Sequence, residues 1–563
     1  MNASLLRNCC HGLARIAIAL TLIMATTCLV AFAQAPGWQT AMIVGGGVAS
    51  TSRTSYSHVS ATASDASGNV YLTGYFDGTV SFGGTILINN SGGVDMFIAK
   101  WNSTSGTFSW AQQAGGAGTL DAKAIAVNGA NVYVGGAFSG TVDIGSQSLT
   151  AANGNAFITR LTDAGTSGIF AWTQRVGGND ANEATAIAVT GTRVYVAGTF
   201  SSVATFGSLS LISAGGKDAF LTKVTDAGAT ANFVWAQQAG GANNDEAKAL
   251  AIGGANIYVA GSFLSATANF GNAVALTNAN ATVPANAYYI AKLTDSGASA
   301  AWTWAQLTNG QGNAIGVNGS SIYVAGAAGN KVGVTKFADS GPTSSLAWTQ
   351  QGGGQVYDVA FSITVDGASV YVAGVVSGAG TFGTNTIRGI GSADAFVAKL
   401  TDAGSIGSWT WVQNAGGVGP DGANSVVVSG AMVYVAGFME SPTAAFGSIT
   451  LAMPPYGSST SFLASFGSAT GLATATPAIL SAITIVPNPA HAVATVRLLP
   501  VAGATQVALT LLDAVGRTVR TQQVAIPAAG AMADLALVGL APGLYHLRVQ
   551  AGGWQSSRTL VVE

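Results

Sequence analysis

The sequence predicts an all-β protein, a seven-bladed β-propeller of four-stranded blades followed by a small Ig-like β-sandwich. Three observations lead to this fold class. Apolar residues come in short runs broken by Gly, Asn, Asp, Ser and Thr, which is the pattern of strands and turns. One unit of about 62 residues recurs seven times, as in repeat folds. Residues 480–563 lack this unit and carry alternating runs of their own.

Charged residues make up only 8% of the 563-residue chain, which contains 76 glycines and has a mean hydropathy of +0.42. A chain this apolar can offset the entropy cost of ordering, so disorder is not expected. The 21 Lys and Arg residues against 23 Asp and Glu leave no basic surface for nucleic acid, which is excluded as a partner. From Gln34 onward no apolar stretch is long enough to span a bilayer, so the mature chain should have no transmembrane segment.

The N-terminus has the pattern of a secretory signal peptide over residues 1–33. Arg7 and Arg15 precede an apolar run over residues 16–33, which ends in small residues at Ala31 and Ala33. We expect export through the Sec translocon and cleavage after Ala33. A membrane anchor is the alternative, because this run almost spans a bilayer, but the Gly-, Ser- and Thr-rich sequence behind it favours cleavage. All three cysteines lie in this segment, so the mature chain has no disulfide or thiolate chemistry.

The repeated unit is built around a Val/Ile-Tyr-Val/Leu-x-Gly pentad and a tryptophan that precedes it. The pentad tyrosines are spaced 62, 62, 63, 65, 48 and 63 residues apart: Tyr71, Tyr133, Tyr195, Tyr258, Tyr323, Tyr371 and Tyr434. The tryptophans lie 23 residues before their tyrosine in five units, 19 before it in the fifth and 33 before it in the first: Trp38, Trp110, Trp172, Trp235, Trp304, Trp348 and Trp411. One aromatic residue at the same place in every unit is what packing between units requires, so both sets are interpreted as core.

Each unit contains four strand candidates, which is the content of one propeller blade. Seven blades suffice to close a ring, predicted here over residues 34–471. The chain starts with a lone strand at Trp38 and the last unit lacks its own tryptophan strand, so the N-terminal strand should complete the last blade. The aspartate of the recurring Thr-Asp-Ala-Gly segment, for example Asp226, is interpreted as a turn former.

These motifs resemble a known repeat family. Val-Tyr-Val-Ala-Gly, Trp-x-x-x-x-Gly-Gly and Asp-Ala-Phe-Leu-Thr-Lys look like the seven-bladed β-propeller (SBBP-type) repeats of bacterial exported proteins, over roughly residues 38–471. The resemblance implies the fold. The family is functionally mixed, so the resemblance implies no active site.

Residues 472–479 form a predicted linker, and residues 480–563 a predicted β-sandwich. Three motifs follow in order, and their characteristic residues are Pro487, Asn488 and Pro489, then Gly516 and Arg517, then Gly543 and Tyr545. This series resembles the type A C-terminal sorting domain of the type IX secretion system of Bacteroidota. The resemblance implies the type IX machinery as a partner and a secreted or cell-surface, outer-membrane-associated location reached through the periplasm. A generic Ig-like accessory module is the alternative.

Groups suited to catalysis are scarce. The mature chain has three histidines and no cysteine, so a Ser-His or Cys-His pair and a zinc site are not expected, and no catalytic residue or cofactor is assigned. One acid in the loop after the Gly-Gly pair recurs in five units: Asp121, Glu183, Glu246, Asp358 and Asp421. Such a ring of acids could bind calcium through oxygen ligands. The favoured alternative is that each carboxylate accepts backbone N–H groups of its own turn.

The sequence therefore predicts a secreted or cell-surface, non-catalytic propeller with a binding, adhesion or scaffold role, whose ligand is a polysaccharide or a protein. An extracellular glycan-active enzyme with carboxylates on one propeller face is the alternative. The depletion of titratable groups argues against the enzyme, because active sites gather such groups. A purely structural surface protein is a third interpretation.

Overall fold

The computed structural model describes residues 35–48, 55–178, 180–271, 273–279, 286–354, 356–455, 457–467, 483–498, 506–513, 517–525, 531–551 and 554–563. The chain divides into two compact units, Met1–Ser468 and Ala469–Glu563. The described residues are all-β, and none of them belongs to a helix that could cross a membrane. The predicted signal peptide with Ala31 and Ala33, and the predicted linker 472–479, lie outside the described residues.

In the first unit, four strands recur in every repeat, and neighbours in chain order pair antiparallel. The inner strands are β3 (Tyr56–Ser64), β8 (Thr119–Asn128), β12 (Glu183–Thr190), β16 (Asp245–Gly253), β22 (Ala314–Asn318), β26 (Val359–Asp366) and β32 (Asp421–Ser429). The second strands, which carry the pentads, are β4 (Val70–Phe82), β9 (Asn131–Ile144), β13 (Arg193–Phe206), β17 (Asn256–Phe263), β23 (Ser321–Ala328), β27 (Ser369–Val376) and β33 (Met432–Met439).

The third and outer strands complete each repeat. The third strands are β6 (Asp95–Asn102), β10 (Gln147–Asp163), β14 (Leu209–Asp226), β20 (Ala287–Asp295), β24 (Lys331–Asp339), β30 (Asp394–Asp402) and β36 (Thr460–Gly467). The outer strands of the first six repeats are β7 (Thr107–Ala114), β11 (Gly168–Gly178), β15 (Ala231–Ala239), β21 (Ala300–Thr308), β25 (Ser344–Gly353) and β31 (Gly407–Ala415).

The outer strand of the last repeat comes from the N-terminal end of the described chain. Strand β1 (Thr40–Val44) pairs antiparallel with β36, with Met42 opposite Leu463. This pairing confirms the expectation that the first strand completes the last sheet. It joins segments more than 400 residues apart and covers an edge that would otherwise present unpaired backbone groups.

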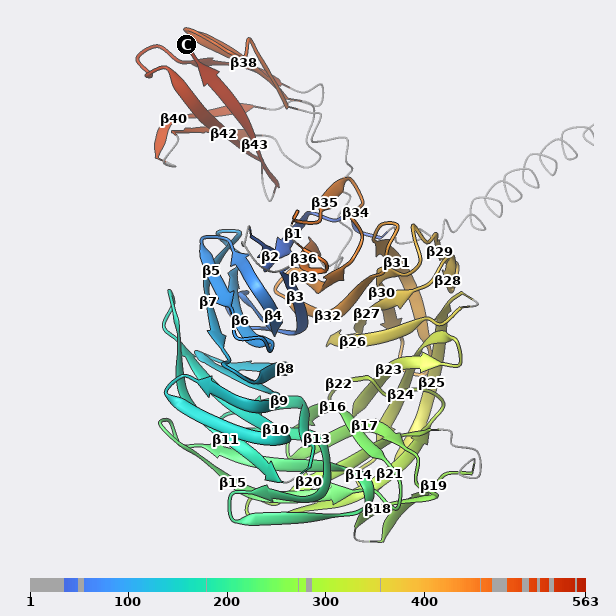
Figure 1. Cartoon of the computed structure of the whole chain (residues 1–563). Coiled ribbons are helices and arrows are strands. Elements are labelled where there is room, and N and C mark those ends of the chain that lie inside the picture. Colours follow the sequence, from blue (N-terminus) through green and yellow to red (C-terminus); the bar gives the residue numbers. More distant parts are fainter. Residues whose placement is uncertain are drawn as a thin grey trace, which may run out of the picture. The chain divides into compact units, whose positions relative to one another are not determined.

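The inner strands contact one another in chain order from β3 to β32, and β32 in turn contacts β3. Figure 1 shows these strands near a common centre, with outer strands such as β7, β11 and β15 at the periphery. Every inner strand therefore has an inner strand of another repeat on each side.

The structure adds a hairpin that four strands per repeat did not predict. It lies between the second and third strands, either as extensions of β9, β10, β13 and β14 or as short separate strands. The separate strands are β5 (Thr85–Asn89), β18 (Thr267–Gly271), β19 (Val274–Thr277), β28 (Gly380–Phe382), β29 (Asn385–Ile387), β34 (Thr443–Phe446) and β35 (Ile449–Ala452). The hairpin also pairs with the outer strand of the preceding repeat, as β28 does with β25, or with β2 (Gly46–Gly47) in the first repeat. In the short fifth repeat β23 and β24 are joined directly.

The pentad tyrosines and the repeat tryptophans lie in the interior, and all are buried except the half-buried Trp38. At five junctions the tyrosine hydroxyl donates to an aspartate of the next repeat at 2.6–2.7 Å, and the tryptophan Nε1 donates to the same carboxylate at 2.9–3.3 Å. These aspartates are Asp163, Asp226, Asp295, Asp339 and Asp402. They include the predicted turn formers, which therefore also link neighbouring repeats.

A buried cation completes each of these five junctions. Lys100, Arg160, Lys223, Lys292 and Lys336 lie 2.5–2.9 Å from the respective carboxylate. The sixth repeat keeps Tyr371, Lys399 and Trp411, but no aspartate bonds Tyr371 in the described part of the chain. Among the described residues, a cation paired with the aspartate that bonds the tyrosine is therefore found at these five junctions.

The second unit is a small sandwich of two antiparallel sheets. One contains β37 (Ile483–Val486), β38 (Val493–Leu498) and β41 (Ala531–Ala536), and the other contains β39 (Gln506–Leu512), β40 (Thr518–Ala525), β42 (Gly543–Ala551) and β43 (Trp554–Val562). Leu509, Leu511, Leu535 and Leu547 are buried in a core shared by both sheets. The predicted β-sandwich is thus present in the described part of residues 483–563.

Candidate functional site

Three of the predicted acids occupy one equivalent position of the repeat, at the start of an inner strand. The backbone carbonyl of this position lies against the last glycine of the pentad, where a Cβ atom would come within 1.8–2.1 Å of the oxygen. The residues at this position are His58, Asp121, Glu183, Glu246, Gln311, Val359 and Gly422. The close approach explains why every pentad ends in Gly, since no other residue fits there.

The other two predicted acids, Asp358 and Asp421, lie one residue earlier and are buried in their turns. Asp421 accepts hydrogen bonds from the Gly417 N–H at 2.7 Å and the Ser441 hydroxyl at 2.6 Å. Asp358 accepts from the Gly354 N–H at 2.5 Å and the Ser377 N–H at 2.7 Å. Each of these two carboxylates bonds its own turn and the segment that follows the second strand, so the five acids occupy two different positions and are not one ring.

No group of three or more His, Cys, Asp or Glu residues that could hold a metal ion occurs among the described residues.

Two residues beyond the shared position, each repeat places one side chain at a cavity of about 230 Å³, called here the axial cavity. These residues are Ser60, Lys123, Thr185, Lys248, Asn313, Phe361 and Asn424. In six of the strands the residue sits at a register shift against the second strand, a β-bulge. Bulges re-aim side chains, and here they turn one side chain per repeat toward the cavity.

Lys123 and Lys248 pair with the acids of the shared position. The Lys123 Nζ lies 2.6 Å from Oδ2 of Asp121 and 3.8 Å from Oε1 of Glu183, and the Lys248 Nζ lies 3.6 Å from Oε2 of Glu246. Burial raises the pKa of the Asp121 carboxyl, although Lys123 opposes this shift. Burial works against the charge of Lys123, but Asp121 and Glu183 hold the pKa of Lys123 above its ordinary value. Both lysines therefore lie next to acids.

In the first repeat, His58 occupies the shared position that holds Asp121, Glu183 and Glu246 in the following repeats. Its ring stacks between Tyr75 and Phe438, with centroid distances of 5.0 Å and 5.6 Å. Burial, assisted by the charge of Lys123, lowers the pKa of His58 to about 4, so the ring is neutral near pH 7. Asn424 Nδ2 lies 3.2 Å from Nε2 and can only donate, which leaves the proton on Nδ1, a buried atom without a partner in the described structure.

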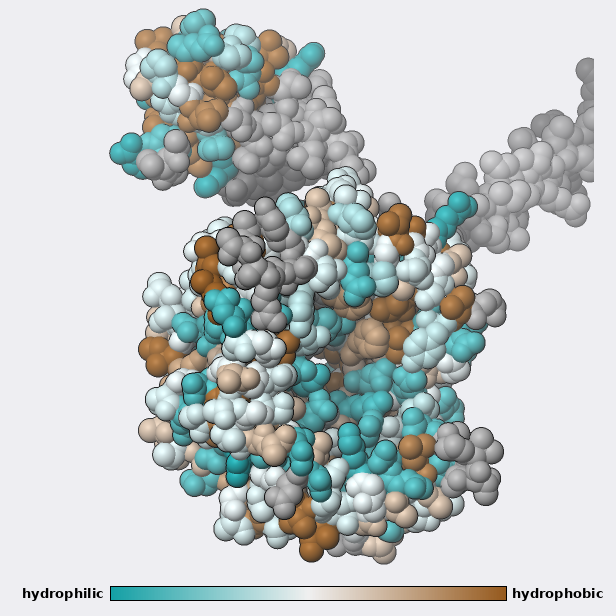
Figure 2. All heavy atoms as spheres, viewed as in Figure 1, coloured by the Kyte–Doolittle hydropathy of each residue, from teal (hydrophilic) through white to brown (hydrophobic). Residues whose placement is uncertain are grey.

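The sixth repeat adds an exposed aromatic ring to the cavity, whose lining also includes Ile125, Ile187 and Leu250 of other repeats. Phe361 lines the cavity and is 39% exposed, and Tyr357 and Val356 are exposed just before strand β26. The Gln311 amide donates to the Tyr357 hydroxyl at 3.0 Å. Figure 2 shows a hollow in this unit with hydrophilic residues along one side and hydrophobic residues along another. Repeats with the same core thus present different chemistry to the cavity.

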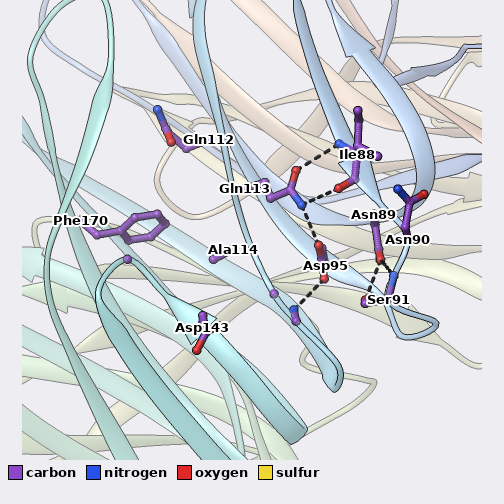
Figure 3. Close-up of a pocket in the computed structure, with 13 residues that line it drawn as sticks. Ile88, Asn89, Asn90, Ser91, Asp95, Gln112, Gln113, Ala114, Asp143 and Phe170 are labelled. Atoms are coloured by element: carbon purple, nitrogen blue, oxygen red, sulfur yellow. Dashed lines mark hydrogen bonds between the residues drawn. The ribbon is translucent and has the colours of Figure 1, made fainter.

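A second cavity of about 680 Å³ lies between the first and second repeats (Figure 3). The Gln113 amide donates from Nε2 to the buried Asp95 carboxylate and to the Ile88 carbonyl, both at 2.8 Å. The Asn89 side chain bonds Ser91 and the Gly93 carbonyl. Burial raises the pKa of Asp95. Because these polar side chains already bond one another and the local backbone, the cavity offers fewer free groups than its size suggests, and the axial cavity is the stronger candidate.

Three of the seven predicted motif residues of the second unit make side-chain hydrogen bonds within it. The Asn488 side chain accepts the Val561 N–H at 2.9 Å, the Arg517 Nε donates to Asp513 at 2.7 Å, and the Tyr545 hydroxyl donates to the Ala541 carbonyl at 2.8 Å. Pro487 and Pro489 flank Asn488 at the end of β37, and Gly543 opens β42. Gly516 lies outside the described residues. Asn488, Arg517 and Tyr545 therefore have structural roles in this unit.

Comparison with known proteins adds one strong match. Residues 484–563 match the family model of the secretion system C-terminal sorting domain. No curated protein matches the chain. Among solved structures, a protein from Lactobacillus plantarum shares 11% identity at a TM-score of 0.37, with 82% of this chain and 99% of that chain covered. A protein of unknown function from Dyadobacter fermentans shares 11% identity at a TM-score of 0.32, with 76% and 100% covered.

Structural similarity at such low TM-scores does not establish a shared fold or function. The sorting-domain match, in contrast, identifies the export route. It agrees with the order of the three motifs and with the sandwich that contains them. The chain therefore carries a type IX secretion C-terminal sorting domain, and it is a secreted or cell-surface protein associated with the outer membrane.

Proposed function

We propose that the mature chain is a non-catalytic, seven-bladed β-propeller that binds an extracellular polysaccharide or protein at its axial cavity. One observation carries this proposal. The core positions of the repeat keep Tyr and Trp, whereas the cavity position varies from Lys to Thr, Asn and Phe. Packing alone would favour the same residue at equivalent positions, so the variation is best explained by a ligand that is not symmetric.

Two further features support a closed ring of seven blades. Strand β1 pairs with β36, and the seven inner strands contact one another in an unbroken cycle. Ring closure also accounts for the cavity, because its lining comes from all seven inner strands. The proposal includes the export route: residues 1–33 act as a signal peptide for the Sec translocon. The type IX machinery then acts on the sorting domain.

The direct test screens the purified chain without residues 1–33 on arrays of extracellular polysaccharides and surface proteins. We expect binding that is lost when Lys123 and Lys248 are both replaced by Ala. The matched control is Arg388→Ala, which removes an exposed cation outside the axial cavity. No binding to any array member, or equal loss in the control, would contradict a binding role at the cavity and would leave a scaffold role.

A glycan-active enzyme is the second candidate, and one observation favours it. Lys123 lies between Asp121 and Glu183 at one cavity, and burial raises the pKa of Asp121, as a general acid requires. The test measures release of reducing ends from polysaccharides that bind the chain. Turnover that Asp121→Asn and Glu183→Gln abolish while binding persists would establish the enzyme. Binding without turnover supports the non-catalytic proposal.

A further inference from the structure

We infer that the ligand of the axial cavity is a neutral saccharide, whose terminal pyranose ring enters with its apolar face on Phe361. The inference rests on the proposed binding function and names the class of ligand. It combines three properties of the cavity, namely one exposed aromatic ring, an opposing set of compensated charges, and a small volume.

Phe361 is the only large apolar side chain among the seven residues that lie two positions beyond the shared position, whose other members are Ser, Thr, Asn and Lys. Phe361 is 39% exposed, and a ring left in solvent contributes little to the packing of the neighbouring core. The face of an aromatic ring is electron-rich and attracts the polarised C–H groups on the apolar face of a pyranose. A sugar ring would therefore cover Phe361 and still expose its hydroxyl groups.

The polar groups lie where those hydroxyls would point. Along the cycle of inner strands, β8 with Lys123 is three contacts from β26 with Phe361 in one direction and four in the other. Lys123 and Thr185 come from the two inner strands opposite β26, and Lys248 comes from the next strand, β16, which is two contacts from β26. Ammonium groups donate hydrogen bonds, and the carboxylates beside them accept, so this side suits hydroxyl groups that do both.

The charges of this side favour a neutral ligand. Lys123 and Lys248 are each next to an acid, and Glu183 also approaches Lys123, so three acids accompany two cations. An acidic sugar would have to draw Lys123 away from Asp121, and a cationic ligand would compete with both lysines. A neutral saccharide can bond the existing pairs without separating them.

The volume limits how much of the ligand can enter. At about 230 Å³ the axial cavity is below the roughly 300–1,000 Å³ of pockets that enclose drug-sized molecules. It therefore suits one sugar ring at the end of a chain better than several rings laid along a groove.

The experiment is calorimetric titration of the mature chain with defined neutral tetrasaccharides of glucose and of mannose, and with tetragalacturonate as the acidic probe. Phe361→Leu keeps an apolar side chain without a ring, and Phe361→Trp keeps a ring. We expect a neutral tetrasaccharide to bind, Phe361→Leu to weaken it about tenfold or more, and Phe361→Trp to retain it. Ile169→Ala, which removes an exposed apolar side chain outside the cavity, should have no effect.

The outcomes separate this inference from the proposed function. If the arrays reveal a ligand that is acidic or a protein, or if Phe361→Leu leaves the affinity for a neutral sugar unchanged, the saccharide inference is overturned and the binding function stands. If the chain binds nothing on the arrays, the proposed function fails and the inference fails with it. Melting temperatures of all variants show that a loss of affinity is not a loss of folding.

Discussion

The Tyr133 hydroxyl donates a hydrogen bond to Oδ2 of Asp226, 93 residues further along the chain, at 2.7 Å. Nη1 of Arg160 lies 2.9 Å from Oδ1 of the same carboxylate, and the side chains of Arg160 and Asp226 are nearly buried. Burial alone would raise the pKa of Asp226, but the bonds from Tyr133 and the other donors around it outweigh burial and lower the pKa. Neighbouring repeats are thus joined by an ionised carboxylate in the interior.

Removing this carboxylate should be costly. Asp226→Ala leaves Arg160 as a buried charge without its acid, and we expect a loss of about 3–5 kcal/mol in the free energy of unfolding. Because the folded pKa of Asp226 lies below its unfolded value, the stability that it contributes is present above about pH 4 and lost as the pH falls further. Urea unfolding of the mature chain at pH 7 and again at about pH 2 measures both effects.

The sixth repeat supplies a matched control for the tyrosine. Tyr133→Phe should cost about 2 kcal/mol, because it removes a hydrogen bond to a buried carboxylate. Tyr371→Phe should cost less, since no aspartate of the described chain bonds Tyr371. Equal losses in the two variants would show that the interaction with aspartate contributes nothing to holding the repeats together.

Two further buried aspartates should give the opposite dependence of stability on pH. Asp218 and Asp394 are buried, and one oxygen of each has no hydrogen-bond partner in the described structure. Asp218 lies next to Asp245. In the second repeat the positions equivalent to these two acids hold Asn155 and Asn182, whose side chains lie 3.3 Å apart. Burial, together with the neighbouring Asp245, raises the pKa of Asp218.

Replacing either acid by Asn should therefore stabilise the chain. Asp218→Asn and Asp394→Asn should each add about 1 kcal/mol at pH 8, because they remove a buried charge that the fold disfavours. The folded state binds the proton more tightly than the unfolded state, so the advantage should shrink as the pH falls through the raised pKa toward 4. Thermal unfolding from pH 4 to pH 8 measures this, and a gain that does not change with pH would contradict the assignment.

Calcium should have no effect on the stability of the chain. Asp358 and Asp421 already accept backbone N–H groups, and Asp121 pairs with Lys123, so the five acids do not converge. We expect the same melting temperature with millimolar calcium, millimolar magnesium or a chelator. A rise that saturates with calcium alone would restore the cation site that the sequence suggested.

Deletion of residues 480–563 should stop export without unfolding the first unit. The two units have separate hydrophobic cores, and the sorting domain is the part that the type IX machinery reads. The truncated chain should accumulate inside the cell envelope with an unchanged β-sheet circular dichroism spectrum. Its appearance in the medium or on the surface at full-length levels would show that another segment directs secretion.

Much of the fold could be predicted because its core repeats. Trp172 and Tyr195 represent a pair that recurs 23 residues apart in five of the seven units, and the structure buries both. The completion of the last sheet by β1 also followed from counting tryptophan strands. The added hairpins were missed because their strands of three to five residues carry too few side chains to show a period.

The candidate site was harder to predict because equivalence in sequence differs from equivalence in space. Asp358 and Asp421 lie five residues before the inner-strand apolar residue, and Asp121 lies four before it. This difference of one residue buries the first two carboxylates in a turn and places the third next to Lys123. The β-bulge that aims Lys123 at the cavity has no sequence signal of its own. The buried cations did have one, since Lys223 recurs three residues before Asp226 in its repeat and Lys336 three residues before Asp339.

The central claim is that the axial cavity binds a sugar, and a crystal structure of residues 34–563 grown with the neutral tetrasaccharide that binds best tests it most directly. The account predicts a pyranose ring on Phe361 with its hydroxyls next to Lys123 and Lys248. A sugar bound elsewhere, with the axial cavity holding only water, would contradict it.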